Sequence, residues 1–370
     1  MSLSPKQPSE KYGFRDAKDL WHSEGENTRS LGCTSCSFKR DCGGLSVNAG
    51  FFDCNALCRC IDPSQCSRVC PNNKIQLVRS MKEIQGLDLG TVPRVPPVGR
   101  VALPPSVPML YHASKRSDAF DTPIAALSLF RMLDKKSGEL RYDSPGALRS
   151  AFKIAPNARV ILSGTHTDPS LERVWGLPDR KGFFRSLAIL GIDLLTTPNF
   201  SLFCDTPRLD DLHSIKRIAT TYAEATQAGL AAALHVNGRT ERDFERWAEF
   251  IAARDEIEWL CFEFGTGAGR QSRISFHIQQ LTALAQFVSR PLRLVIRGGT
   301  SELPRLRPHF EQISVIDTSA FVKTQRRQRA AIVDGQLRWG PSPTRKDEPL
   351  DALLAHNVDT VAQHVNELAQ

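Results

Sequence analysis

The sequence predicts an α/β protein in which a complete or partial (β/α) barrel-like domain follows a small cysteine-rich metal-binding module. Three observations predict this arrangement. Eight of the ten cysteines lie close together near the N-terminus, a proline-rich segment follows them, and short apolar runs then alternate with helix-sized amphipathic segments. The expected divisions are a polar arm (residues 1–30), the cysteine-rich module (31–90), a proline-rich linker (91–110) and the barrel-like domain with a basic C-terminal segment (111–370).

Composition and charge are those of an ordinary globular protein. Of the 370 residues, 41% are hydrophobic and 24% are charged, which is enough apolar material to bury a sizeable core. The net charge of +8 is compatible with a polyanionic partner, although a surplus of this size also serves solubility. The first 29 residues lack the apolar stretch of a signal peptide, and no apolar run reaches the ~18 residues that a membrane span needs. We therefore expect a cytoplasmic protein.

The cysteine-rich module has the spacing of a metal site. A reducing cytoplasm does not maintain structural disulfides, so a dense cysteine cluster there is kept for metal. Cys33 and Cys36 are separated by two residues, which lets two thiolates reach one metal ion. The predicted ligands are Cys33, Cys36, Cys42, Cys54, Cys58, Cys60, Cys66 and Cys70.

The identity of the metal is left open between two choices. The ending Cys-x3-Cys-Pro, from Cys66 to Pro71, is shared with bacterial ferredoxins and favours a 4Fe–4S iron–sulfur cluster. The opening resembles the auxiliary-cluster (SPASM) motif of radical enzymes, except that Ser46 stands where that motif has its fourth cysteine. Eight thiolates also make two four-cysteine zinc sites, which is the alternative, and a disulfide-linked knot is the third. The Cys-x3-Cys-x2-Cys signature of radical S-adenosylmethionine chemistry does not occur.

Six prolines between Thr91 and Pro108 mark the linker, because proline at this density disfavours both helix and sheet. Downstream, six short apolar runs predict strands at 159–163, 192–196, 231–236, 257–264, 292–297 and 313–316. Amphipathic segments predict helices at 181–190, 210–228, 242–254, 275–289, 304–310 and 350–368. Strands separated by helix-length segments give a parallel sheet with right-handed crossovers. Six such units, with room for more upstream, favour a barrel over an open doubly wound sheet.

The carboxyl ends of the predicted strands are polar, and in a (β/α) barrel these ends carry the chemistry. Candidate catalytic residues are Asn199, Asp205, Asn237, Glu263 and Asp317. Candidate ligand- or phosphate-binding residues are Ser201, Arg208, His235, Arg239, Gly265, Gly267, Gly269, Arg270 and Arg297. Each of them has an alternative role as a helix cap or turn former. A mouth lined by such groups suits a phosphorylated or nucleotide-like ligand.

Two local clusters add to this pattern. The glycine-rich turn from Gly265 to Arg270 offers backbone N–H groups to a phosphate, but it lacks the Lys-Ser/Thr of a P-loop and the tail of a dinucleotide-binding fingerprint. His213, Lys216 and Arg217 share one face of a predicted helix. That face is either solvated, with its charges paired, or a basic strip beside the mouth.

The densest positive patch lies near the C-terminus. Its predicted nucleic-acid contacts are Lys323, Arg326, Arg327 and Arg329, and further basic residues follow at Arg338, Arg345 and Lys346. The one aromatic residue interleaved with them is Trp339, so stacked binding of a single strand is not indicated.

Two segments resemble an uncharacterised family, domain of unknown function 4417. They are Pro198-Asn-Phe-Ser-Leu-Phe-Cys-Asp205 and the stretch from Gly229 to Asp243 that contains His-Val-Asn-Gly-Arg. The family recurs in phages and mobile elements, and the resemblance covers roughly residues 160–321, under half of the chain. It implies an α/β domain and points to Asn199, Ser201, Asp205, Asn237 and Arg239 as site residues. It implies no particular reaction.

These features lead to one principal hypothesis and two alternatives. The principal hypothesis is a metal-cluster protein of mobile-element type whose α/β domain binds or processes a nucleotide or nucleic acid. One alternative is a base- or nucleotide-modifying barrel enzyme. Its support is that Leu353-Leu-Ala-His356-Asn357 is similar to the end of the transglycosylases, although their Cys-x-Cys-x2-Cys zinc pattern is missing from the C-terminal half. The other alternative is a non-catalytic docking subunit with structural zinc, bound to a protein partner through the cysteine-rich module.

Overall fold

The computed structural model describes residues 28–29, 46–47, 68–70, 73–97, 99, 101–134, 138–203, 208–266, 271–345 and 347–369. Near the N-terminus it describes two short antiparallel strands, β1 (Thr28–Arg29) and β2 (Ser46–Val47). The predicted metal ligands from Cys33 to Cys66 lie outside the described residues. Cys70 is described and is buried.

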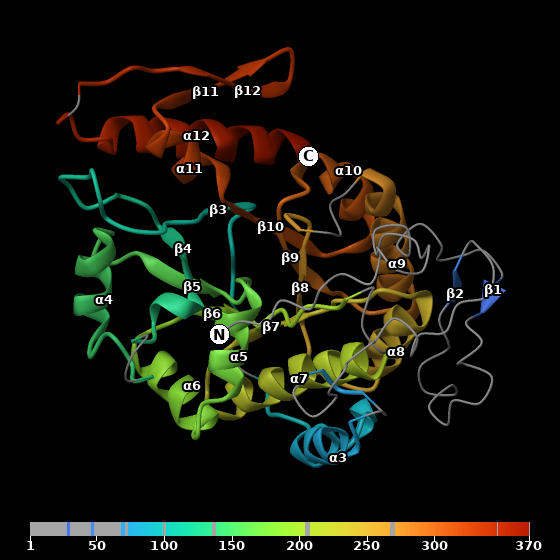
Figure 1. Ribbon diagram of the computed structural model, residues 1–370. Helices are drawn as coiled ribbons and strands as arrows, with labels where there is room; N and C mark the ends of the chain where they lie inside the picture. The colour runs from blue at the N-terminus through green and yellow to red at the C-terminus, as the bar shows by residue number, and fades with distance from the viewer. Residues whose placement is uncertain are drawn as a thin grey trace, which may run out of the picture.

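Eight parallel strands form a nearly closed barrel (Figure 1). They are β3 (Ser106–Pro108), β4 (Ile124–Ser128), β5 (Arg159–Ser163), β6 (Leu194–Thr196), β7 (Ala232–His235), β8 (Trp259–Glu263), β9 (Arg293–Arg297) and β10 (Gln312–Asp317). Their order around the barrel is β3-β10-β9-β8-β7-β6-β5-β4. A parallel bridge between Met109 and Ala126 joins the two ends of the sheet, and Leu110 N–H donates to the carbonyl of Ala126 at 2.9 Å. The barrel-like α/β fold is therefore confirmed.

Strand β3 lies inside the segment that was predicted to be a linker. It pairs with β10 in the register Ser106 to Val315, and Val107 is fully buried. Prolines flank the strand and end it, but a parallel strand of three residues needs few backbone N–H groups. The linker prediction does not hold for this part of the segment, which is the first strand of the barrel.

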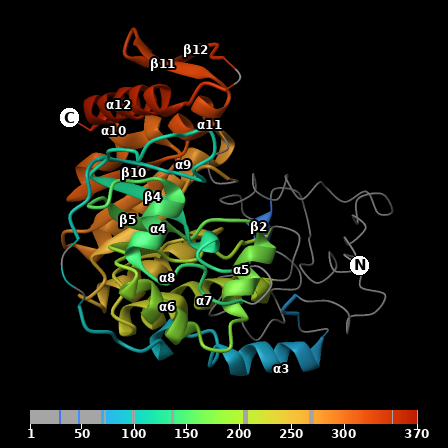
Figure 2. The ribbon, with the colours of Figure 1, turned by 90° about the vertical axis from the view of Figure 1, so that its left-hand side faces the viewer.

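Helices alternate with the strands and surround the barrel (Figures 1 and 2). They are α4 (Pro145–Phe152), α5 (Asp168–Trp175), α6 (Arg180–Ile189), α7 (Arg208–Gln227), α8 (Glu241–Ala252), α9 (Gln271–Val288), α10 (Leu303–Leu306), α11 (Ser319–Gln325) and α12 (Asp351–Leu368). Single 3-10 turns are η4 (Leu89–Thr91), η5 (Leu129–Arg131), η7 (Thr300–Glu302) and η8 (Arg307–His309). None of the helices in the described part of the chain is long and apolar enough to cross a membrane.

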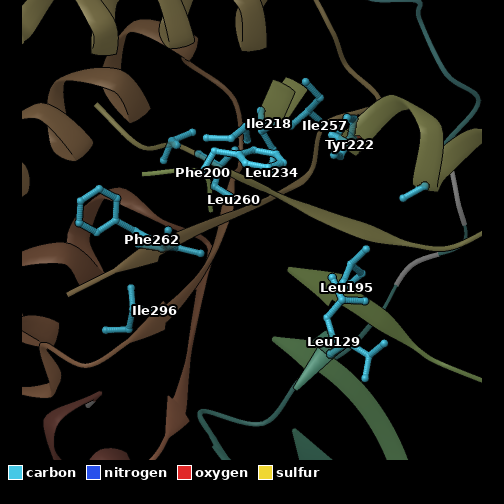
Figure 3. Close-up of a cluster of buried hydrophobic side chains, with 14 of the residues drawn as sticks. Leu129, Leu195, Phe200, Ile218, Tyr222, Leu234, Ile257, Leu260, Phe262 and Ile296 are labelled. Atoms are coloured by element: carbon cyan, nitrogen blue, oxygen red, sulfur yellow. The ribbon is translucent and has the colours of Figure 1, made fainter. Parts of the chain in front are cut away.

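Two separate cores hold the barrel together. One fills its interior with side chains such as Val107, Ala126 and Cys261. The larger core lies between the strands and the surrounding helices (Figure 3) and includes Leu234 and Phe262. Successive strand residues point to opposite faces, so each strand supplies both cores in alternation.

Residues 73–97, which we call the strap, lie along the outer side of α7 and α8. The strap contains helix α3 (Lys74–Glu83) and η4. The ammonium group of Lys216 donates to the carbonyl of Asp88, and the guanidinium of Arg254 donates to the carbonyl of Val92 at 2.9 Å. Of the 20 residues of α7, 17 are buried.

The strap overturns both interpretations of the charged face of α7. His213, Lys216 and Arg217 are each less than 9% exposed. Arg217 pairs with Glu172 at 2.8 Å and lies over the ring of Phe200. This face is therefore neither solvated nor a basic strip beside the mouth, because the strap and α5 cover it.

A two-stranded ribbon, β11 (Gln328–Val333) and β12 (Gln336–Pro341), lies outside the barrel along α12 (Figures 1 and 2). Its turn is Asp334-Gly335, with φ of 51° and 71°. Positive φ at both central residues is typical of a type I′ hairpin. Arg329 and Arg338 lie on this ribbon. Residues 319–327, which we call the root of the ribbon, lead into it and contain Lys323, Arg326 and Arg327.

Candidate functional site

Six consecutive strands, β4 to β9, end on a polar residue. These residues are Ser128, Ser163, Thr196, His235, Glu263 and Arg297, and we call them the mouth ring. The residues two positions earlier all belong to the apolar core of the barrel interior: Ala126, Ile161, Leu194, Ala233, Cys261 and Val295. Because side chains alternate along a strand, the mouth ring points to the same inner side. The barrel therefore has an apolar interior closed at the carboxyl ends of the strands by a polar layer.

An ion pair occupies one side of the mouth ring. The Oε2 atom of Glu263 accepts from the guanidinium of Arg297 at 2.7 Å, and its Oε1 atom accepts from the backbone N–H of Gly265 at 2.6 Å. The Glu263 side chain is 1% exposed, and that of Arg297 is 24% exposed. Burial lowers the pKa of Arg297, but the Glu263 carboxylate outweighs this and the net shift is upward. The Glu263 carboxylate thus favours the charged form of Arg297.

His235 is an uncharged member of the mouth ring. Burial lowers the pKa of its imidazole to about 3, so the ring is neutral at physiological pH. Its Nδ1 atom is buried and has no hydrogen-bond partner among the described residues. The backbone N–H of His235 donates to the hydroxyl of Thr197 at 2.9 Å, which fixes the end of β7 against β6. A neutral imidazole can donate from one nitrogen and accept at the other.

The hydroxyl members of the ring differ in what they bind. The hydroxyl of Thr196 accepts from the backbone N–H of Gly164 at 2.9 Å and ties β5 to β6. A side chain at Gly164 would meet the carbonyl oxygen of Thr196 at 2.3 Å, so this close approach requires glycine. The hydroxyl of Ser128 is buried and, within the described part of the chain, has no partner.

Two asparagines lie just beyond the ring. The side-chain amide of Asn237 donates to the side-chain oxygen of Asn199 at 2.8 Å and to the carbonyl of Phe200 at 3.2 Å. The indole N–H of Trp247 donates to the backbone carbonyl of Asn237 at 2.9 Å. The structure therefore brings together two residues that the sequence predicted separately, and it orients their amides. Nearby, the hydroxyl of Ser201 donates to Asp168 at 2.5 Å.

Arg208 and Arg239 are engaged in buried ion pairs, and their role in ligand binding stays a prediction. Arg208 pairs with Asp211 at 3.0 Å and also with Asp243, and Arg239 lies 3.5 Å from Asp211. Arg246 completes the cluster at 3.2 Å from Asp243. All of these side chains are largely buried. They form a buried charge cluster at the starts of α7 and α8 that supports the mouth from outside.

Asp317 also has a structural role rather than a place in the mouth ring. Its carboxylate accepts from the backbone N–H and hydroxyl of Ser319 and from the backbone N–H of Ala320. These contacts cap the start of α11. Gly265 is exposed and contacts Glu263. The remaining candidates Asp205, Gly267, Gly269 and Arg270 lie outside the described residues.

The basic C-terminal residues lie on the ribbon and its root, outside the barrel. Arg326 and Arg329 are exposed, whereas Lys323 and Arg327 are half-buried. The guanidinium of Arg327 donates to the hydroxyl of Thr344 at 2.7 Å. These residues are therefore on the surface, as a polyanion contact requires.

Ser128, Ser163 and Thr196 are the mouth-ring residues that sequence reasoning missed. Their signal is present, because each ends a short apolar run and stands two positions after an inward apolar residue. Across the described residues, no three His, Cys, Asp or Glu side chains are gathered to hold a metal ion.

Comparison with protein-family models finds no match to this chain, and comparison with curated proteins finds none either. The resemblance to domain of unknown function 4417 stays a prediction. Function has to be argued from the barrel mouth and from the surface of the protein.

Proposed function

We propose that the barrel mouth binds a nucleotide, with its base against the mouth ring, and that the protein binds or processes nucleotides or nucleic acid in the cytoplasm. The observation that carries this proposal is the mouth ring itself, a polar layer directly above an apolar barrel interior. Buried polar atoms without partners cost about 1–3 kcal/mol each. Among the described residues, the hydroxyl of Ser128 and Nδ1 of His235 are such atoms, so a ligand that enters the mouth and pairs with them is favoured.

The charge balance of the ring supports a base rather than a phosphate at this position. Arg297 is matched by Glu263, and His235 is neutral. The ring therefore offers donors and acceptors side by side with no net charge. The edge of a nucleobase carries the same mixture of donors and acceptors. A phosphate at this position would meet Arg297, which is already paired with Glu263.

The first test is equilibrium binding of nucleosides, nucleoside monophosphates and free bases to the full chain by calorimetry. In the double variant Glu263→Gln/Arg297→Gln both charges are removed together, so neither is left buried alone. Loss of one or two ligand hydrogen bonds should weaken binding about tenfold or more. The matched control is Glu258→Gln/Arg293→Gln, because that ion pair (3.2 Å) joins the same two strands at their opposite ends. Equal weakening in both variants, or no binding to the parent protein, contradicts the proposal.

A base-modifying activity is the second candidate. Glu263 is the one carboxylate of the mouth ring, and it is held at the carboxyl end of β8 beside a paired arginine. A carboxylate so placed can act as nucleophile or base toward a bound nucleotide. The same Glu263 variant therefore also serves in turnover assays with any nucleotide that binds.

We also propose that the cysteine-rich module binds an iron–sulfur cluster, with zinc as the alternative. The support is the spacing of the eight cysteines in the sequence. Anaerobic purification followed by a visible spectrum and metal analysis should give a brown protein with bound iron. A colourless protein with about two zinc ions supports the alternative. A folded protein with neither metal contradicts metal binding.

A further inference from the structure

More than half of the net positive charge of this protein lies in one segment. Residues 319–345 contain a single acidic residue, Asp334, and six basic ones: Lys323, Arg326, Arg327, Arg329, Arg338 and Arg345. That surplus of five accounts for more than half of the net charge of +8. The rest of the chain is nearly balanced, so the surplus belongs to the ribbon and its root.

The outer face of the ribbon is cationic and narrow. Arg329 stands opposite Gly340, and Arg338 stands opposite Ala331, so each arginine has a small residue across from it. Arg326, Arg329 and Arg338 are exposed. Between the ribbon and α12 there is a groove of about 550 Å³, lined by polar groups that include Arg329, His356 and Thr360.

The aromatic side chains of the segment do not contribute to this outer face. Trp339 pairs with the buried Ala330 on the inner side of the ribbon, and Lys323 lies 5.7 Å from its ring. Phe321 is buried. A surface that binds single strands by stacking needs outward aromatic rings. Within residues 319–345 the outer face instead offers positive charge.

The ribbon is fixed to the barrel by a buried residue. Asn357 on α12 is fully buried. Its side-chain oxygen accepts from the backbone N–H of Ala330, and its amide nitrogen donates to the carbonyl of Gln328 and to the hydroxyl of Thr324, each at 2.8 Å. The ribbon is therefore held in place before any partner binds.

The basic root lies at the mouth end of α12. The first residues of α12 contact the loop that follows β3: Leu350 N–H donates to the carbonyl of Lys115, and Asp351 accepts from the N–H of Ser117, both at 2.8 Å. The other end of α12 reaches Pro105, just before β3, because Leu368 and Pro105 line one cavity. A polyanion that lies across the root is thus next to the barrel mouth.

We propose that the ribbon and its root bind the phosphate backbone of a double-stranded nucleic acid. An antiparallel ribbon has the width to enter a major groove, and exposed arginines are common phosphate contacts. This inference depends on the proposed function in one respect: it takes the nucleotide bound at the mouth to be part of a polynucleotide. The backbone contact itself is tested without any ligand at the mouth.

The test is fluorescence anisotropy of the full chain with a labelled duplex of about 25 base pairs, over a range of salt concentrations. The variant is Arg326→Ala/Arg329→Ala/Arg338→Ala. The control, Arg173→Ala/Lys181→Ala/Arg185→Ala, removes the same charge from exposed positions on α5 and α6. The ribbon variant should bind at least about tenfold more weakly, and the slope of log K against log salt should fall by about 2–3, because each lost phosphate contact contributes ~0.9. The control should bind as the parent does.

Equal losses in the two triple variants, or no loss in the ribbon variant, overturn the proposal. Equal affinity of the parent for single-stranded and duplex DNA overturns the choice of a double-stranded partner. Because Arg329 also contacts His356 at 3.0 Å, the double variant Arg326→Ala/Arg338→Ala repeats the measurement with that contact intact. The Glu263→Gln/Arg297→Gln variant separates the two proposals: it should lose nucleotide binding and keep duplex binding, whereas the ribbon variant should do the reverse.

Discussion

Lowering the pH from 7 to about 5 is expected to reduce the free energy of unfolding by about 6 kcal/mol, through three buried histidines. Burial lowers the pKa of His213, His235 and His277 to about 3 in the folded protein, from 6.5. Between these two pH values the three imidazoles bind more protons in the unfolded chain than in the folded one, so their contribution to stability is complete above about pH 6.5 and is lost as the pH falls. Each histidine contributes ~1.4 kcal/mol per pH unit in this window. Urea denaturation at several pH values measures the slope.

His277 offers a way to isolate one of the three contributions. It is 1% exposed, and its ring lies within 5.2–5.8 Å of the rings of Phe244, Phe262 and Phe276. Neither ring nitrogen has a hydrogen-bond partner among the described residues. His277→Phe should therefore keep the packing and recover about 2 kcal/mol at pH 5. His166→Gln, at an exposed position, is the control, and an unchanged slope in His277→Phe would contradict the assignment.

Replacement of Asp243 by Asn is expected to destabilise the protein by about 3–5 kcal/mol. Asp243 is fully buried and pairs with Arg208 and with Arg246. Burial tends to raise the pKa of Asp243, but the two guanidinium groups and two backbone N–H groups outweigh it and hold the pKa below its usual value. The Asn side chain would leave two buried cations without their shared carboxylate. Urea denaturation at neutral pH gives the change in unfolding free energy.

Glu245→Gln is the matched control for Asp243→Asn, because Glu245 lies on the same helix and forms an ion pair with Arg242 at 3.0 Å. That pair is largely exposed, so its loss should cost at most about 1 kcal/mol. Similar small effects for both variants would show that the buried charge cluster does not hold α7 and α8 in place. Asp243 also accepts from the N–H groups of Arg239 and Thr240. Its loss should therefore weaken nucleotide binding as well, through the turn that carries Asn237.

The order and type of the barrel elements follow from local sequence pattern. Buried parallel strands are continuous apolar runs, so 159–163 was predicted with its observed bounds and the next five strands within three residues at either end. Strands β3 and β4 were not among the six predicted strands. Strand β3 is short and lies among prolines, whereas β4 is a buried run of five residues upstream of the first predicted strand. The ribbon was missed although Asp334-Gly335 between Val333 and Gln336 is a hairpin signal.

Those site residues were predictable whose role depends on their place at the carboxyl end of a strand. His235, Glu263 and Arg297 were found because each is one of the last two residues of a predicted strand, and each ends the observed strand. The role of Arg208 depends on Asp243, a partner 35 residues away, and no local pattern shows that pairing. The burial of Lys216 likewise depends on the strap, which lies more than 100 residues earlier in the chain. Ion pairs and hydrogen bonds between charged residues far apart in the chain cannot be predicted from the local pattern of one sequence.

The pairing of β3 with β10 sets the order of events while the protein is synthesised. Ser106 lies opposite Val315, so closure of the barrel waits for roughly 200 further residues, about 10–40 s of translation. During that time Val107 and Met109, which end in the interior core, have no β10 to cover them. A nascent chain that stalls before Gln312 presents open sheet edges and apolar side chains to the cell. Such a chain is a natural client for chaperones on the ribosome.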